Sequence, residues 1–181
     1  LKHLQTLISS SAQVDKTHSY DEPGIYTVTV TGQSAGFFGG TTDKAKLIDI
    51  VQWGTITPNY IRQSSLSGYA NLVGTYSDTA PIGSGESQNI LLESPKFNGW
   101  VNDWDMSGIT NLNQGLWNAA SFNQNVGAWD ISNVTSFYGL FRGTAFNNGG
   151  SPDINNWRPL SATRFEGIFQ LSPFNQNIGG W

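Results

Sequence analysis

The apolar and polar positions of the chain follow a period of two near its beginning and a much longer period in its second half. In residues 20–32, a Pro23-Gly24 turn precedes a segment in which polar threonines alternate with Tyr26, Val28 and Val30. Alternation of this kind, in residues with branched or aromatic side chains, is typical of a β-strand with one apolar face. The pattern therefore predicts a strand directly after this turn.

A second apolar segment, residues 43–54, contains four aliphatic residues and Trp53. An apolar run of this length fits a short buried strand better than a helix. Beyond Thr55 the pattern weakens into stretches rich in Gly and Ser, which include a degenerate first repeat unit at 66–81. We therefore expect this region to connect the N-terminal strand to the part of the chain that repeats.

From Phe97 onward the sequence repeats itself with a period of about 24 residues. Each copy begins with a Phe-Asn pair, and successive pairs are 25, 24 and 28 residues apart. A Trp follows the Phe after seven residues, except in the third copy, where it follows after eleven. Four additional residues within 148–153 account for this difference, so we predict a loop insertion there. A period of this size indicates stacked units that bury together an apolar column no single unit can bury alone.

Within the first three copies, a Thr follows the Trp after six residues, and a pair of large apolar residues follows the Thr. These pairs are Leu116-Trp117, Leu140-Phe141 and Ile168-Phe169, so Trp117 is placed where the others have Phe. A short strand followed by a brief helical turn is the arrangement of leucine-rich repeats. The predicted fold class is α/β: a short leucine-rich-repeat-like solenoid of about 24-residue units with a small N-terminal β region. The predicted domains are a partial β-sandwich-like strand region (1–32), a connecting segment with the degenerate first repeat (33–96), and the repeat solenoid with an incomplete last repeat (97–181).

The recurring side chains have structural interpretations. Large apolar residues at fixed repeat positions are assigned to the core, because burial of one contributes about 1.5–3 kcal/mol. They are Phe97, Trp104, Phe122, Trp129, Phe141, Phe146, Trp157, Phe169, Phe174 and Trp181. Polar residues in register are assigned to ladders that hydrogen-bond neighbouring coils. They are Asn98, Asn123, Asn147, Asn175, Thr110, Thr135 and Thr163. Trp100 and Tyr138 lie off the repeated apolar positions, which makes them candidates for contact with a partner.

Residues 122–141 resemble the repeat of BspA-like leucine-rich-repeat surface proteins, a bacterial surface lipoprotein-type family. The elements Phe-Asn-Gln, Trp-Asp-x-Ser-Asn-Val-Thr and a closing Leu-Phe occur here in the order of that family. Residues 46–54 are similar to a segment that often precedes the repeats, and residues 20–30 resemble the last strand of a polycystic-kidney-disease-type domain. Arg158-Pro159-Leu160 departs from the Asp-x-Ser of the pattern. The resemblance implies adhesion or protein binding at a cell surface, or a virion role in large phages, and it supplies no catalytic residues.

Composition argues against several classes of function. Only 12% of the residues are charged, the net charge is −4, and nine Lys and Arg are scattered, whereas nucleic-acid binding needs clustered cations. There is no Cys, and His3 and His18 have no partner at metal-site or triad spacing. No apolar run is long enough to span a bilayer. We therefore expect no cofactor, no metal and no membrane span. The remaining acidic candidates lack calcium-loop spacing and are interpreted as turn or capping groups; they are Asp103, Asp105, Asp130 and Asp153.

The sequence therefore predicts a non-catalytic, surface-exposed binding or adhesion module that recognises a protein or glycan partner. Its expected location is extracellular, on a cell surface or on a virion surface. Two alternatives stay open: an architectural virion component, such as a phage fibre or capsid-decorating protein in contact with other subunits, and a polysaccharide-cleaving enzyme. For the enzyme, Glu86, Glu93 and Glu166 supply carboxylates, and Glu166 is the first candidate. The half repeat at 174–181 is expected to be covered by more chain or by a neighbouring subunit.

Overall fold

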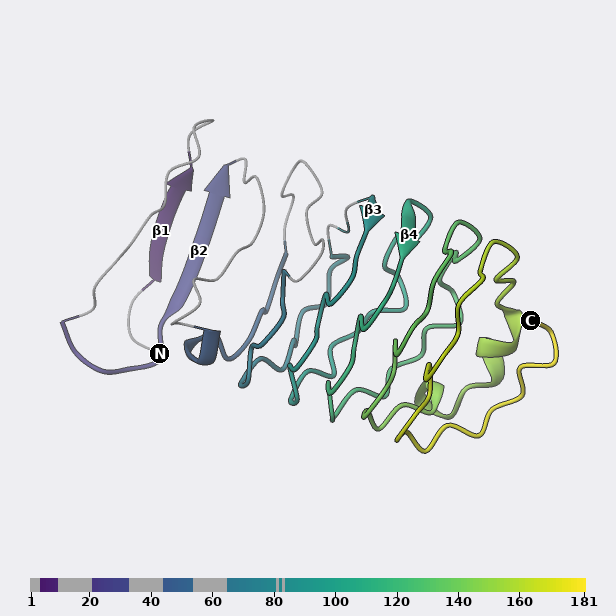
Figure 1. Cartoon of the computed structure of the whole chain (residues 1–181). Coiled ribbons are helices and arrows are strands. Elements are labelled where there is room, and N and C mark those ends of the chain that lie inside the picture. Colours follow the sequence, from purple (N-terminus) through teal and green to yellow (C-terminus); the bar gives the residue numbers. More distant parts are fainter. Residues whose placement is uncertain (1–3, 10–20, 33–43, 54–64, 81, 83) are drawn as a thin grey trace.

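The computed structural model describes residues 4–9, 21–32, 44–53, 65–80, 82 and 84–181 (Figure 1). Its regular elements are β1 (Leu4–Ser9), β2 (Thr27–Gly32), η1 (Lys44–Lys46), β3 (Gly85–Glu86), β4 (Ile109–Asn111), η2 (Asn148–Gly150) and η3 (Pro152–Asn156), where η denotes a 3₁₀ helix. The rest is irregular backbone that runs in successive coils, side by side, toward the C-terminus. Among the described residues, no helix is long and apolar enough to cross a membrane.

β1 and β2 form a two-stranded parallel sheet, in which Leu4 pairs with Thr27 and Ser9 pairs with Gly32. The strand predicted after the Pro23-Gly24 turn is thus confirmed as β2. In the segment before β2, the Tyr26 hydroxyl donates a hydrogen bond to the carbonyl oxygen of Glu22 at 2.6 Å. This bond joins the two sides of the turn that precedes the strand.

The buried strand predicted around Ile50 is wrong. After η1 the chain continues to Trp53 without forming a strand. Ile50 and Trp53 are buried, whereas Ile48 and Val51 are 42% and 61% exposed, so the inward positions are three residues apart rather than two. The Trp53 amide donates to both carboxylate oxygens of Asp78, at 2.9 and 3.0 Å. A side chain, and not a neighbouring strand, therefore satisfies this part of the backbone.

Residues 65–80 and 84–181 form a stack of coils in which each coil donates backbone hydrogen bonds to the next. Successive donor and acceptor residues are Leu91 and Gly115, Leu116 and Leu140, and Phe141 and Ile168, at 2.7, 2.9 and 2.9 Å. β3 and β4 pair in parallel, and single parallel bridges continue this pairing from Asn111 to Ser136 and from Ser136 to Arg164. The backbone therefore fixes the register of every coil on its neighbour.

The predicted α/β fold class, a leucine-rich-repeat-like solenoid with a strand and a helical turn in each unit, is wrong. The described residues contain no α-helix, their 3₁₀ helices are three to five residues long, and both of their sheets have only two strands. The place of the expected helical turn is taken by consecutive β-turns. In one coil, Gly115 donates to the Leu112 carbonyl at 3.1 Å, and Ala119 donates to the Leu116 carbonyl at 2.9 Å.

Left-handed backbone conformations explain why no helix forms in these coils. The third residues of the two turns, Gln114 and Asn118, have φ values of 55° and 59°. The next coil has Gly139 and Gly143 at the same places, with φ values of 61° and 68°. A positive φ at the third position is the requirement of a type II turn, and it interrupts a right-handed helix. Because such residues recur four positions apart, the chain bends away before a helical segment can extend.

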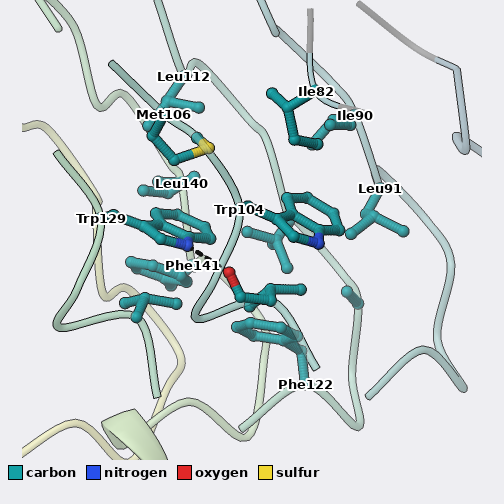
Figure 2. Packing of buried hydrophobic residues seen from close by; sticks show 14 of the residues in the cluster. Ile82, Ile90, Leu91, Trp104, Met106, Leu112, Phe122, Trp129, Leu140 and Phe141 are labelled. Atoms are coloured by element: carbon teal, nitrogen blue, oxygen red, sulfur yellow. Dashed lines mark hydrogen bonds between the residues drawn. The ribbon is translucent and has the colours of Figure 1, made fainter. Parts of the chain in front are cut away.

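The interior of the stack contains columns of like side chains. One cluster of buried apolar residues extends from Ile50 to Ile168. The ring of Phe122 is stacked between those of Phe97 and Phe146, with centroids 6.4 and 6.0 Å away. These distances lie in the range of favourable offset stacking. Figure 2 shows the same tight packing where Phe122 and two Trp rings meet aliphatic side chains of neighbouring coils.

Candidate partner-binding surface

The repeated Phe and Trp residues lie inside the stack. Trp104, Trp129, Trp157 and Trp181 form a column with successive centroid distances of 6.3, 6.2 and 5.5 Å. The Trp129 Nε1 donates to a carbonyl of the preceding coil, that of Val101, at 2.6 Å (Figure 2). The ten residues assigned to the core are buried, except that Phe169, Phe174 and Trp181 of the last coil are partly buried. These rings contact one another and form the interior.

The four repeated Asn residues form a ladder along one edge of the stack. The Asn98 Oδ1 accepts the Asn123 amide at 2.9 Å, and the Asn123 Oδ1 accepts the amides of Asn147 and Gly149 at 2.7 and 3.0 Å. The Asn147 Oδ1 then accepts the Asn175 amide at 3.0 Å. The side chains of Asn98, Asn123 and Asn147 thus each satisfy the backbone of the following coil, which assigns the ladder to structure, whereas Asn175 takes part only through its backbone amide.

The repeated Thr residues also link each coil to the preceding one, but here the side chain of the later coil donates and a backbone carbonyl accepts. The backbone amide and the hydroxyl of Thr135 both donate to the Thr110 carbonyl at 2.9 Å. The amide of Thr163 donates to the Thr135 carbonyl at 2.9 Å, and its hydroxyl reaches the same oxygen at 3.4 Å. Their polar groups are therefore engaged by neighbouring backbone.

The two candidate contact residues, Trp100 and Tyr138, lie apart from each other. Trp100 is 47% exposed and follows the ladder residue Asn98, on the segment that leads to the Trp column. Within the part of the chain that the structure describes, its ring makes no contact with another aromatic ring. Tyr138 is half-buried and contacts Trp117 and Arg164 instead. Only Tyr138 belongs to a larger group of aligned side chains.

That group, which we call the aromatic-arginine strip, consists of Trp117, Tyr138, Arg142, Arg164 and Glu166. The Trp117 and Tyr138 rings meet edge to face, with centroids 6.2 Å apart. The Arg142 guanidinium lies over the Trp117 ring at 4.2 Å, and that of Arg164 lies over the Tyr138 ring at 4.3 Å. Cations at such distances are attracted by the negative face of the ring. The strip therefore combines two rings and two stacked cations across three neighbouring coils.

Trp117 was not recognised as part of this surface because its repeat position was misassigned by one residue. The backbone bond from Leu116 to Leu140 aligns Leu116, and not Trp117, with the core residue Phe141. Trp117 is aligned with Arg142, since the Asn118 amide donates to the Arg142 carbonyl at 2.8 Å. The spacing from the repeated Thr residues gives this alignment from sequence: Leu116 and Phe141 each follow a Thr after six residues.

A glycine makes room for the Trp117 ring. Gly139 has a φ of 61°, and a Cβ on this residue would lie 2.9 Å from Cε3 and 3.2 Å from Cζ3 of Trp117. Contacts below about 3 Å do not occur between real Cβ atoms and carbon neighbours. The ring thus rests on bare backbone of the next coil, where Arg142 then covers it.

The two arginines differ in their ionic partners. The Arg164 Nε donates to the Glu166 Oε2 at 3.2 Å, with side chains that are 47% and 65% exposed. Glu166, the candidate acid, is therefore an exposed carboxylate paired with a cation. The guanidinium of Arg142 is half-buried on Trp117 and has neither a carboxylate partner nor a hydrogen-bond acceptor among the described residues.

Two of the Asp residues cap turns. The amide and hydroxyl of Ser107 donate to the Asp105 Oδ1 at 3.1 and 2.6 Å, and these bonds lower the pKa of Asp105. Hydrogen bonds from the side chain and backbone of Ser132 lower the pKa of Asp130 in the same way.

Inside the core, burial raises the pKa of the Tyr76 hydroxyl, which therefore stays protonated.

The other acidic candidates are dispersed over the stack. Asp103 accepts a hydrogen bond from the Thr79 hydroxyl at 3.0 Å, and Asp153 accepts one from the Asn125 Nδ2 at 3.1 Å. Glu86, in β3, accepts a hydrogen bond from the Gln88 side chain. Glu93 is exposed and has a left-handed backbone conformation with a φ of 55°. The described residues contain no group of three or more His, Cys, Asp or Glu side chains that could hold a metal ion. His3 and His18 lie outside the described residues.

A shallow hollow of about 250 Å³ lies beside the departure from the repeat at Arg158. It is lined by Trp129, Asp130, Ile131, Ser132, Asn156, Trp157 and Arg158. The Arg158 guanidinium donates to the carbonyls of Asn155 and Trp157, both at 2.8 Å, so it is used in the local fold. Asp130, the other charged residue of the lining, accepts a hydrogen bond from the Ser132 amide at 3.0 Å as a turn cap.

Comparison with known protein families gives a match. A family model with the description "Mycoplasma protein of unknown function, DUF285" matches residues 87–181, which is more than half of the chain. This segment contains the aromatic-arginine strip and all four Asn residues of the ladder. No curated protein and no solved structure matches the chain.

Proposed function

Because the chain belongs to the DUF285 family, whose function is unknown, we propose that it is a non-catalytic binding module that contacts a protein or glycan partner through the aromatic-arginine strip. The repeated part of the fold serves as a scaffold that holds the strip in register. The proposal needs no cofactor and no reacting group.

The observation that carries the proposal is the difference between the strip and the core. The Phe and Trp columns are buried and contact one another, so their recurrence at fixed repeat positions follows from packing. Trp117 and Tyr138, in contrast, hold two guanidinium groups at the surface. Trp, Tyr and Arg are the residue types most enriched among the side chains that dominate binding energy at interfaces. The strip concentrates these three types where the fold does not require them.

The proposed location is extracellular, on a cell surface or on a virion surface. The resemblance of residues 122–141 to BspA-like surface repeats supports this location, because proteins of that family are exposed at the cell surface. The low charge and the Asn-rich turns fit a scaffold whose polar side chains serve its own backbone.

The test uses protein and glycan arrays probed with the wild type and with a Trp117→Ala/Tyr138→Ala double variant. We expect the double variant to lose at least about tenfold in affinity for the partner that the wild type captures. Trp100→Ala is the matched control, since it removes an exposed aromatic ring outside the strip, and it is expected to bind as the wild type does. Unchanged binding by the double variant, checked to be folded by circular dichroism, would contradict the proposal.

A further inference from the structure

The group in the strip with the most unused binding capacity is the guanidinium of Arg142. It is held over Trp117 at 4.2 Å, and among the described residues it donates to no acceptor and pairs with no carboxylate. A guanidinium carries five N–H donors in a fixed planar arrangement like a fork, has no acceptor and stays protonated. Stacking fixes the plane of this fork while its edge stays free. Arg142 is therefore ordered in advance for a planar anion.

The rings of the strip are less available than the guanidinium groups. The backbone of Gly139 lies beside Cε3 and Cζ3 of Trp117, and the guanidinium groups of Arg142 and Arg164 lie over the rings of Trp117 and Tyr138. A neutral sugar that stacks on either of these covered faces would have to displace a guanidinium. A carboxylate, in contrast, can meet the free N–H edge without any rearrangement.

The geometry points to an acidic protein segment as the partner, with Arg142 as the residue that binds an Asp or Glu carboxylate of that segment through two parallel hydrogen bonds. This inference rests on the proposed function and names the chemistry of the partner. A protein segment is favoured over an acidic glycan because Trp, Tyr and Arg together are typical of protein interfaces, and charge complementarity then selects an acidic sequence.

The charge of the rest of the chain makes this a local interaction. The net charge is −4, so an acidic partner is not attracted by the chain as a whole. Arg164 is already paired with Glu166 at 3.2 Å, which leaves Arg142 as the unpaired cation of the strip within the described residues. Removal of this one charge should therefore matter far more than removal of a cation elsewhere.

The experiment measures binding of a twelve-residue Glu-rich peptide by nuclear magnetic resonance, with the signal of the Arg142 Nε–H as the local probe. A peptide of the same length with Gln in place of Glu, and a polygalacturonate oligomer, are titrated in parallel. We expect the Glu peptide to bind and to shift the Arg142 signal, and the Gln peptide to bind at least about tenfold more weakly.

Three variants separate a specific contact from general attraction. Arg142→Gln removes the fork and is expected to weaken binding of the Glu peptide about tenfold. Arg142→Lys keeps the charge but not the planar fork, and it is expected to recover only a minor part of the loss. Lys96→Gln removes a charge whose ammonium donates to Asn71 Oδ1, away from the strip, and is expected to change binding less than about twofold.

An equal loss in Lys96→Gln and Arg142→Gln, or full binding by Arg142→Lys, would overturn the inference in favour of non-specific attraction. Tighter, Arg142-dependent binding of polygalacturonate would overturn it in favour of an acidic glycan. The proposed function fails on a different result, since it requires only that some array partner be lost in the Trp117→Ala/Tyr138→Ala variant. If a partner is lost in that variant but still binds Arg142→Gln, the proposed function stands and the inference of an acidic partner is wrong.

Discussion

The interior columns and the aromatic-arginine strip use the same kinds of side chain for different purposes. In the columns, each ring is stacked on an equivalent ring of the next coil, as Trp104 is on Trp129 at 6.3 Å. In the strip, Trp117 has no equivalent ring in the next coil and instead meets Arg142 at 4.2 Å. An aromatic residue that recurs in register thus belongs to the packing, and one that occurs only once in its column is free for another role.

The difference also separates stability from binding in this fold. Loss of a column ring leaves a cavity between two coils and should affect every coil that stacks on them. Loss of a strip ring removes a surface contact whose cation can return to solvent. Substitutions in the columns should therefore mainly reduce stability, whereas substitutions in the strip should mainly reduce binding.

The sharpest test of this separation compares Phe122→Ala with Trp117→Ala. The Phe122 ring is fully buried between Phe97 and Phe146, so its removal should lower the free energy of unfolding by about 3–5 kcal/mol. Removal of Trp117 should cost only about 1 kcal/mol, the size of an exposed cation–π contact with some packing. Urea unfolding of both variants measures the two values. Similar losses would mean that Trp117 is a core residue after all.

The next largest effect is expected for the Asn ladder, which supports both regions. In Asn123→Ala the amides of Asn147 and Gly149 lose their acceptor, which should cost about 1–3 kcal/mol. Asn123→Asp keeps an acceptor oxygen and should lose less. Asn175→Ala is the control, because the side chain of Asn175 makes no hydrogen bond among the described residues. If chemical denaturation shows equal losses for the two Ala variants, the ladder does not contribute to stability.

The contact between the strip and its backbone support can be broken at Gly139. A Cβ there would meet Trp117 at 2.9 Å on a backbone with a φ of 61°, so Gly139→Ala should cost about 1–2 kcal/mol and displace the ring. Gly150→Ala tests the backbone part alone, since its φ is 80° and a Cβ there would meet nothing within 4 Å. Thermal unfolding gives the stabilities. In a Gly139→Ala/Trp117→Ala double variant the clash with the ring is gone, so its loss of stability should be smaller than the sum of the two single losses. A loss equal to that sum would mean that Gly139 and Trp117 are not in contact.

The smallest effect concerns the turn-capping carboxylates, which lie at the surface but belong to neither region. The pKa of Asp130 is lowered in the folded chain from its ordinary value of 3.8 by hydrogen bonds from Ser132. A lowered pKa means that the ionised form stabilises the fold above that ordinary value, and that this contribution is lost as the pH falls below it. Asp130→Ala should therefore be slightly less stable than the wild type at pH 7, with a gap that closes toward pH 2. Unfolding of both proteins is followed by fluorescence between pH 7 and pH 2. A difference in the free energy of unfolding that stays constant over this range would assign the effect to the turn geometry instead.

The repeat and much of its register could be predicted from the sequence. The intervals between Phe, Trp, Asn and Thr indicated which residues recur at one position, because a stacked fold requires equivalent residues to meet in space. The strand at 27–32 also followed from alternation. The extra residues of the third copy were predicted as a loop within 148–153, where the structure has η2 and the beginning of η3, which continues to Asn156.

The form of the backbone within each repeat could not be read from these intervals. A period near 24 residues is compatible with a strand and a helical turn or with a succession of β-turns, and only the turn residues distinguish the two. Gly139 and Gly143, four residues apart, were the available signal, since glycine at both places favours left-handed conformations. Gln114 and Asn118 conceal that signal in the preceding coil, because residues with side chains occupy the same conformations there.

The strip could not be derived from the sequence either, with the exception of Tyr138. Its contacts between coils join residues that are 21, 25 and 26 positions apart, and they depend on a register that is correct to a single residue. An error of one position aligned Trp117 with Phe141 and Phe169 and hid its contact with Arg142. These cation–π pairs have no signature in the sequence, because Arg142 and Arg164 contact rings of the preceding coil rather than neighbours in the chain.

The insertion at η2 and η3 separates the length of the chain from the geometry of the stack. The additional residues leave the coil after Phe146 and return at Ile154, whose carbonyl accepts the Trp181 Nε1 as the Val101 carbonyl accepts that of Trp129. The columns on both sides therefore stay in phase although one unit is longer than the others. At this place the fold behaves as a display scaffold: sequence can be added or exchanged between two fixed points while the period of the rings, and the surface they support, is preserved.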